Sequence, residues 1–143
     1  MRTYERRGWF RLTLPDGWEV DESEDPPAIY RPEGSGVLHV TARDTRPPRP
    51  GEKIDVEFML RMFLRQSGTD PKKLAIRKWT ERGVEWAGTE FEEEGPEGDL
   101  LRWLVWLATN HDLILFLSYV RRADEGEPER PEVEAIVKSL EFF

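Results

Sequence analysis

Apolar residues are densest between Asp99 and Arg122. Two apolar runs there flank a short polar break, Thr109-Asn110-His111-Asp112, and in both runs the odd and the even positions are largely apolar. A strand exposed on one face alternates between apolar and polar residues, whereas a strand covered on both faces is apolar almost throughout. The stretch therefore predicts a tight antiparallel hairpin at the centre of a sheet, with other elements packed on both faces of that sheet.

Shorter strands are predicted on either side of this hairpin. Apolar and polar residues alternate over residues 9–14 and 37–42, a short apolar run covers 28–30, and two mixed runs cover 74–79 and 84–91. Pro-Asp-Gly at 15–17, Pro-Glu-Gly-Ser-Gly at 32–36 and Gly83 predict tight turns between them. The three prolines at 46–51 exclude a helix or an inner strand, so we interpret this segment as a crossover from the sheet to a helix.

Two helices are predicted, at about residues 53–66 and from Pro131 to about residue 140. The second has apolar residues at i, i+3, i+4 and i+7, which predicts that it packs on the sheet; these are Val133, Ile136, Val137 and Leu140.

The first helix carries only a narrow polar stripe: Lys53, Glu57, Arg61 and Arg65. Its remaining positions are nearly all apolar, an arc wider than packing on one sheet requires. Either another part of the chain covers the surplus or a partner does, and flexible methionines suit adaptable apolar surfaces. The candidate partner-binding residues are Phe58, Met59, Met62 and Phe63.

The order of elements predicts a single α+β domain over residues 1–143, with a central antiparallel sheet flanked by helices on both faces. Of the 143 residues, 38% are hydrophobic and 35% charged, and no apolar run approaches the ~20 residues that a transmembrane helix needs. We therefore expect no membrane insertion. The N-terminus is charged and no apolar run follows it, which argues against a secretory signal and favours a cytoplasmic location. The net charge of −8 argues against nucleic-acid binding.

Motifs that carry chemistry are missing from the sequence. There is no cysteine, no phosphate-binding glycine loop and no nucleophile elbow, and the two histidines, His39 and His111, lie far apart with no metal-ligand spacing. We expect no enzyme activity, no cofactor and no metal, and we expect His111 to bond within its own turn. Six tryptophans are interpreted as core filling, with an aromatic-lined cleft for an apolar ligand as the alternative.

Two stretches, residues 16–25 and 90–99, hold six acidic residues each and no basic residue. Charge runs usually stay in water, so we expect a solvated loop at 16–25 and a solvated hairpin rim at 90–99. The alternative is a site for a hard cation formed by Glu92, Glu94, Glu97 and Asp99.

Several segments, in chain order, resemble the PsbP-like fold family. They are Phe10-x-Leu12-x-Leu14-Pro15-Asp16-Gly17-Trp18, a strand ending near Thr41-Ala42-Arg43, a mid-chain apolar helix, two long hairpins, and residues 133–142. The family includes an extrinsic photosystem II subunit, a Ran-binding nucleotide-release factor and many small bacterial proteins, and the chain resembles a small bacterial member. The resemblance implies an α/β/α sandwich, which the doubly apolar hairpin indicates independently. The photosynthetic members are exported, and the missing export signal argues against a photosystem role.

The resemblance also implies a binding module rather than an enzyme, since the bacterial members include cytoplasmic chaperones that hold apolar transmembrane segments of type VI secretion effectors. The expected function is thus a non-enzymatic, adaptor- or chaperone-like protein-binding module, acting through a protein partner or self-association. The alternative is a binder of a small apolar ligand in a cleft between sheet and helix.

Overall fold

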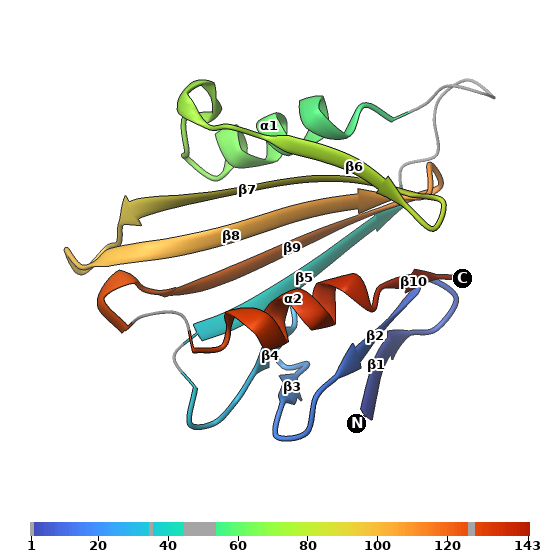
Figure 1. Ribbon diagram of the computed structural model, residues 1–143, viewed down its shortest axis with the longest axis horizontal. Coiled ribbons are helices and arrows are strands. Elements are labelled where there is room, and N and C mark those ends of the chain that lie inside the picture. Colours follow the sequence, from blue (N-terminus) through green and yellow to red (C-terminus); the bar gives the residue numbers. More distant parts are fainter. Residues whose placement is uncertain (1, 35, 45–53, 126–127) are drawn as a thin grey trace.

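A computed structural model describes residues 2–34, 36–44, 54–125 and 128–143. Two sheets and two helices make up this part of the chain (Figure 1). The strands are β1 (Arg2–Arg6), β2 (Phe10–Leu14), β3 (Glu19–Asp21), β4 (Ala28–Tyr30), β5 (Gly36–Asp44), β6 (Arg77–Glu81), β7 (Val84–Glu94), β8 (Leu100–Thr109), β9 (Leu113–Arg122) and β10 (Glu141–Phe142). The helices are α1 (Val56–Gln66) and α2 (Arg130–Lys138), with short 3₁₀ turns η1 (Pro71–Lys73) and η2 (Ala123–Glu125).

The large sheet has seven antiparallel strands in the order β3-β4-β5-β9-β8-β7-β6. The predicted hairpin forms its centre, because β8 pairs with β9 while β7 and β5 pair with their outer edges. The hairpin turn has the αL geometry that such tight turns need, with His111 at φ 76°. The α+β prediction is confirmed, and Figure 1 shows α1 on one side of the large sheet and α2 with the small sheet on the other.

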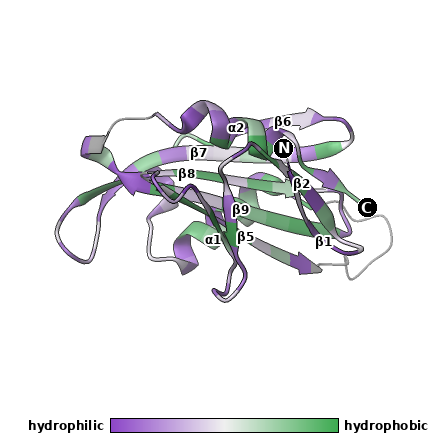
Figure 2. Cartoon of the chain, turned by 90° about the horizontal axis from the view of Figure 1, so that it is seen from below, coloured by the Kyte–Doolittle hydropathy of each residue, from purple (hydrophilic) through white to green (hydrophobic). Residues whose placement is uncertain are grey.

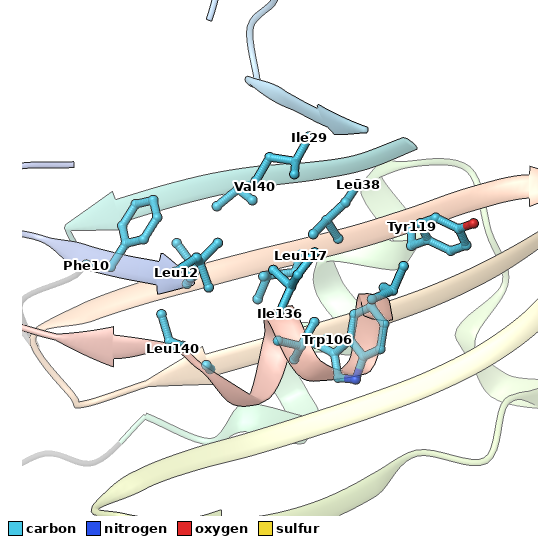
Figure 3. Close-up of a cluster of buried hydrophobic side chains, with 14 of the residues drawn as sticks. Phe10, Leu12, Ile29, Leu38, Val40, Trp106, Leu117, Tyr119, Ile136 and Leu140 are labelled. Atoms are coloured by element: carbon cyan, nitrogen blue, oxygen red, sulfur yellow. The ribbon is translucent and has the colours of Figure 1, made fainter. Parts of the chain in front are cut away.

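The first face of the large sheet, which we define as the face under α2, is filled by the chain itself. Even-numbered residues of β8 and odd-numbered residues of β9 meet α2 and the small sheet β1-β2-β10 in one buried cluster (Figure 3). Leu12, Leu117 and Ile136 lie in this cluster with no exposed surface. The alternation along β8 and β9 matches the predicted division of side chains between the two faces. Figure 2 shows the hydrophobic colour concentrated along the inner strands and little of it on the outer strand β6.

Helix α1 begins at Val56, later than the predicted Lys53, because Asp55 is its N-cap. The backbone of Asp55 is extended, and its carboxylate accepts a hydrogen bond from the N–H of Phe58 at 3.1 Å. The predicted end at about residue 66 is confirmed: α1 ends at Gln66, Gly68 has φ 91°, and its N–H donates to the carbonyl of Arg65.

Two predicted boundaries need correction, and some strands were missed. Strand β6 begins at Arg77, not at residue 74, because η1 turns the chain just before it. Strands β1 and β10, which join β2 in a separate sheet, were not predicted. Strand β3 was not predicted either, since it lies within the stretch 16–25 that was expected to be a loop. Helix α2 begins at Arg130, one residue before the predicted Pro131. The predicted proline crossover lies at 46–51, outside the described residues.

Candidate functional site

The second face of the large sheet, under α1, is only partly covered. Helix α1 buries Val56, Leu60 and Leu64 against side chains of β7, β8 and β9, which are Ala87, Val105, Leu107, Ile114 and Phe116. Toward β5 and the β7–β8 turn, the same face carries half-buried side chains that α1 does not cover. This uncovered part of the sheet forms the floor of a groove.

The groove encloses about 620 Å³ beside α1. Its floor comes from four adjacent strands, β5, β9, β8 and β7, and its wall from the C-terminal half of α1. Its lining residues include His39, Thr41, Phe63, Trp103, Ser118 and Val120.

The floor is apolar and aromatic at its centre. The strand register places Val120 of β9 opposite Trp103 of β8, and Trp103 opposite Phe91 of β7. The rings of Phe91 and Trp103 stack with centroids 6.2 Å apart. On the wall, Phe63 of α1 stacks on Phe116 of β9 with centroids 4.1 Å apart, which fixes the helix side of the groove.

Polar groups lie toward the β5 side of the floor and at the rim. His39 of β5 lies opposite Ser118 of β9, with Thr41 two residues further along β5. Arg43 and three acidic residues also line the groove; the acids are Asp25, Glu93 and Glu94. The Glu93 carboxylate accepts a hydrogen bond at 2.9 Å from the hydroxyl of Thr69, just beyond α1. The rim is therefore more acidic than basic.

The four candidate residues on α1 separate into two pairs. Phe58 and Met62 are exposed, by 58% and 37% respectively. Met59 and Phe63 are half-buried and pack against the core under α1. Of the four, Phe63 lines the groove. The predicted binding surface of α1 therefore reaches the groove at this residue.

His111 bonds within its own turn, as predicted, and also beyond it. Its backbone N–H donates to the hydroxyl of Thr109 at 2.9 Å. Its ring nitrogen Nδ1 accepts from the N–H of Ile54 at 3.1 Å, and Nε2 lies 3.2 Å from a carboxylate oxygen of Glu85. The imidazole thus ties the central hairpin turn to the start of α1, outside the groove.

Three of the six acidic residues between Glu90 and Asp99 lie close to arginines. Arg102 lies between Glu90 and Glu92, at 3.3 and 3.6 Å, and Arg122 lies 3.8 Å from Asp99. Within residues 2–34, 36–44, 54–125 and 128–143, no group of three or more His, Asp or Glu side chains is placed to hold a metal ion. In that same part of the chain, neither helix is long and apolar enough to cross a membrane.

The tryptophans of the strands do not share one cleft. Trp103 lies in the groove, whereas Trp79, Trp86 and Trp106 line a smaller hollow of about 260 Å³ on the first face, beside α2. Trp79 and Trp86 stack there with centroids 5.8 Å apart and nearly parallel planes. These three rings therefore extend the core of the first face.

The polar floor residues His39, Thr41 and Ser118 were not predicted to belong to a site. The sequence carries a signal for them: polar residues alternate with Leu38, Val40 and Ala42 along β5, and Ser118 interrupts the apolar run of β9 on the same face. Both features indicate a sheet surface that the chain leaves accessible.

Comparisons with known proteins bear on the fold. No family model matches the sequence, and no curated protein matches it. A crystal structure of a protein from Bacteroides thetaiotaomicron VPI-5482 matches with a TM-score of 0.69 and 16% identity; the match covers 99% of this chain and 48% of that one, so this chain spans about half of its length.

Two further structures match over most of both chains. Cyanobacterial PsbP (CyanoP) from Synechocystis sp. PCC 6803 has a TM-score of 0.64 at 13% identity, covering 99% of this chain and 92% of that one. LpqN of Mycobacterium tuberculosis, described as involved in cell envelope biogenesis, has a TM-score of 0.58 at 13% identity, covering 93% of this chain and 82% of that one. The chain therefore has a PsbP-like fold, as its sequence motifs indicated.

Proposed function

We propose that this chain is a non-enzymatic protein-binding module, adaptor- or chaperone-like, that holds an apolar helical segment of a partner protein in the groove beside α1. The observation that carries the proposal is the incomplete cover of the second face. Helix α1 packs over the half of this face that lies nearer the β8–β9 turn, where it covers side chains such as Leu107 and Ile114. The half nearer the β7–β8 turn, with Phe91, Trp103 and Val120, stays uncovered together with the adjoining part of β5. A groove floor that crosses four strands spaced about 4.8 Å apart is wide enough for a helix about 10 Å wide.

The chemistry of the floor and rim fits an amphipathic segment. Trp103, Val120 and Phe91 offer an apolar and aromatic surface, which is typical of the anchoring part of an interface. The rim carries Asp25, Glu93 and Glu94 against Arg43, and the whole chain has a net charge of −8. Basic residues on the polar face of the bound segment would complement this rim.

The same floor supports a binding role over a catalytic one. His39 and Ser118 are cross-strand neighbours, but within the described residues no hydrogen bond joins their side chains and no carboxylate orients the imidazole. Nucleophilic catalysis requires a base within hydrogen-bond reach of the nucleophile and a third group that orients the base.

The test is binding of a labelled amphipathic helical peptide with a leucine-rich face and a lysine-rich face, compared with a scrambled peptide of the same composition. Val120→Lys places a charge on the groove floor. Water solvates this charge in the free protein, but a bound peptide would exclude that water. The matched control is Leu100→Lys, which makes the same kind of change on the same hairpin at an exposed position outside the groove.

We expect saturable binding that Val120→Lys weakens about tenfold or more, equivalent to ~1.4 kcal/mol, and that Leu100→Lys leaves unchanged. Equal binding of the two peptides, or equal effects of the two substitutions, would contradict the proposal.

The alternative, a small apolar ligand, is favoured by one observation: the groove volume of about 620 Å³ falls within the range of about 300–1,000 Å³ common for small-molecule sites. Native mass spectrometry of the purified chain distinguishes the two. A bound small molecule that Val120→Lys displaces would favour the ligand, and a bare protein that binds the peptide would favour the module.

A further inference from the structure

The outer edge of β6 is an unpaired strand edge at the opposite end of the sheet from β3. Strand β6 pairs with β7 on one side, and among the described residues no strand pairs with its other side. Arg77, Lys78, Thr80 and Glu81 are all exposed, and Trp79 is half-buried. Figure 2 shows β6 as the outermost strand beside β7.

The register of the β6–β7 hairpin determines which main-chain groups face outward. Arg82 and Gly83 form a two-residue turn, with φ 51° and 77°, between the paired residues Glu81 and Val84. In such a hairpin the residues flanking the turn form a hydrogen-bonded pair, and these pairs alternate along the ladder. Trp79 therefore directs its N–H and C=O to β7, whereas Lys78 and Thr80 direct theirs to the open edge.

The side chains of β6 are complementary to those of a second β6 run in the opposite direction. With a two-fold axis at Trp79, Arg77 lies opposite Glu81 of the other copy and Lys78 lies opposite Thr80. Lys78 and Thr80 are the residues with outward main-chain groups, so both of their pairs form ladder hydrogen bonds. The two Trp79 side chains then meet in a non-hydrogen-bonded pair, where side chains approach most closely and aromatic pairs are favourable.

The outer edges formed by β1 and β3 lack this complementarity. A two-fold axis at the centre of β1 places Arg2 opposite Arg6, and one at the centre of β3 places Glu19 opposite Asp21. Like charges directly opposite each other oppose pairing. In the monomer, Arg77 and Glu81 are both exposed, and within the described residues neither forms an ion pair; the Arg77 guanidinium lies 5.8 Å from the centroid of the Trp79 ring.

We propose that this chain self-associates through β6, which pairs antiparallel with β6 of a second copy and joins the two large sheets into one. A two-fold contact of this kind uses the same patch on both copies and closes at the dimer. It leaves the groove open, because the groove floor lies over β5, β9, β8 and β7 and not over β6. The proposal is independent of what the groove binds.

The contact is short, so association should depend on concentration. A five-residue strand edge buries far less surface than the interfaces of stable dimers. We expect sedimentation velocity to show a monomer–dimer equilibrium that shifts toward the dimer between about 10 µM and about 1 mM protein.

Charge reversal at the paired positions gives the decisive test. Arg77→Glu makes both cross-axis pairs acidic, and Glu81→Arg makes both pairs basic, so each variant alone should dimerise about tenfold more weakly or worse, equivalent to ~1.4 kcal/mol. An equimolar mixture restores opposite charges at both pairs and should recover dimerisation. Glu97→Arg, at an exposed turn residue remote from β6, is the control for net charge.

A main-chain variant tests the ladder itself. Thr80→Pro removes an N–H that faces the open edge and is not needed for pairing with β7, so it should abolish dimerisation while circular dichroism stays unchanged. Three results would each overturn the proposal: a wild-type protein that remains monomeric over the whole range, a mixture of charge variants that does not recover, or a folded Thr80→Pro variant that dimerises as the wild type does. Dimerisation through Phe58 and Met62 would be insensitive to all these changes and would appear as the third result.

Discussion

The two faces of the large sheet are equally apolar along the central hairpin, yet the chain covers them differently. On the first face, α2 and the small sheet close over Leu117 and Leu104 and leave a continuous buried cluster. On the second face, α1 and the residues that flank it pack over only part of the sheet, and Trp103, Val120 and His39 remain half-buried. An apolar strand face therefore needs to be covered. Whether the chain itself covers it depends on which other helices and strands the chain has available.

The largest expected loss of stability comes from a substitution in the first face, which the chain itself covers. Ile136→Ala on α2 removes a side chain with no exposed surface from the cluster in Figure 3. We expect the free energy of unfolding to fall by about 2–5 kcal/mol, the usual cost of truncating a buried isoleucine. Urea denaturation measures it, with the exposed Leu100→Ala as a control that should change by less than about 0.5 kcal/mol. A loss below about 1 kcal/mol for Ile136→Ala would mean that α2 does not hold the first face together.

The next effect separates the two sides of α1. Met59 is half-buried against the core and Met62 is exposed. Met59→Glu should lower the free energy of unfolding by about 1–3 kcal/mol because it brings a charge against apolar side chains, whereas Met62→Glu should change it by less than about 0.5 kcal/mol. Thermal unfolding of the two variants side by side tests this. Equal losses would show that α1 buries more of its circumference than the structure indicates.

A smaller effect concerns the beginning of α1. Asp55→Ala removes the carboxylate that accepts from the N–H of Phe58 and should cost about 0.5–2 kcal/mol. The loss should be reduced in Asp55→Ser, since serine also caps helices. Urea denaturation of the three proteins gives the comparison, and an unchanged Asp55→Ala variant would mean that packing on the second face alone fixes this end of α1.

The last prediction is that removal of divalent cations does not change the stability of the fold. Neither face contains a group of His, Asp or Glu side chains arranged for a metal within the described residues. Adding EDTA should therefore leave the midpoint of thermal unfolding unchanged. A fall of several degrees would show that a bound cation stabilises the protein and would make the acidic stretch at residues 90–99 the candidate site.

The sequence predicted the fold better than the site. The doubly apolar runs of β8 and β9 indicated a central hairpin covered on both sides, because burial on both faces leaves a pattern within a single strand. Strand β1, Arg-Thr-Tyr-Glu-Arg, carries no such pattern: only Tyr4 is half-buried, and its pairing with β2 depends on a partner strand. The groove was harder to predict than the strands. It forms where α1 stops covering the sheet, and the apolar periodicity of a helix does not determine where on a sheet that helix packs. Phe63 was predicted as a surface residue of α1, and only the structure places its ring on Phe116 at the groove wall.

Helix α1 is held at both ends by single polar contacts. The N–H of Ile54 donates to His111 before its first turn, and the hydroxyl of Thr69 donates to Glu93 after its last. Lifting the helix would break both hydrogen bonds, at about 0.5–1.5 kcal/mol each. It would also expose the buried side chains of Val56, Leu60 and Leu64, at about 1.5–3 kcal/mol each, so the helix stays closed on the sheet.

An occupant must therefore fit the space that α1 leaves, because moving the helix to admit a wider one costs more than breaking its end contacts. Size selection by the groove thus depends on side chains under α1 that the occupant never touches, and not only on the apolar floor.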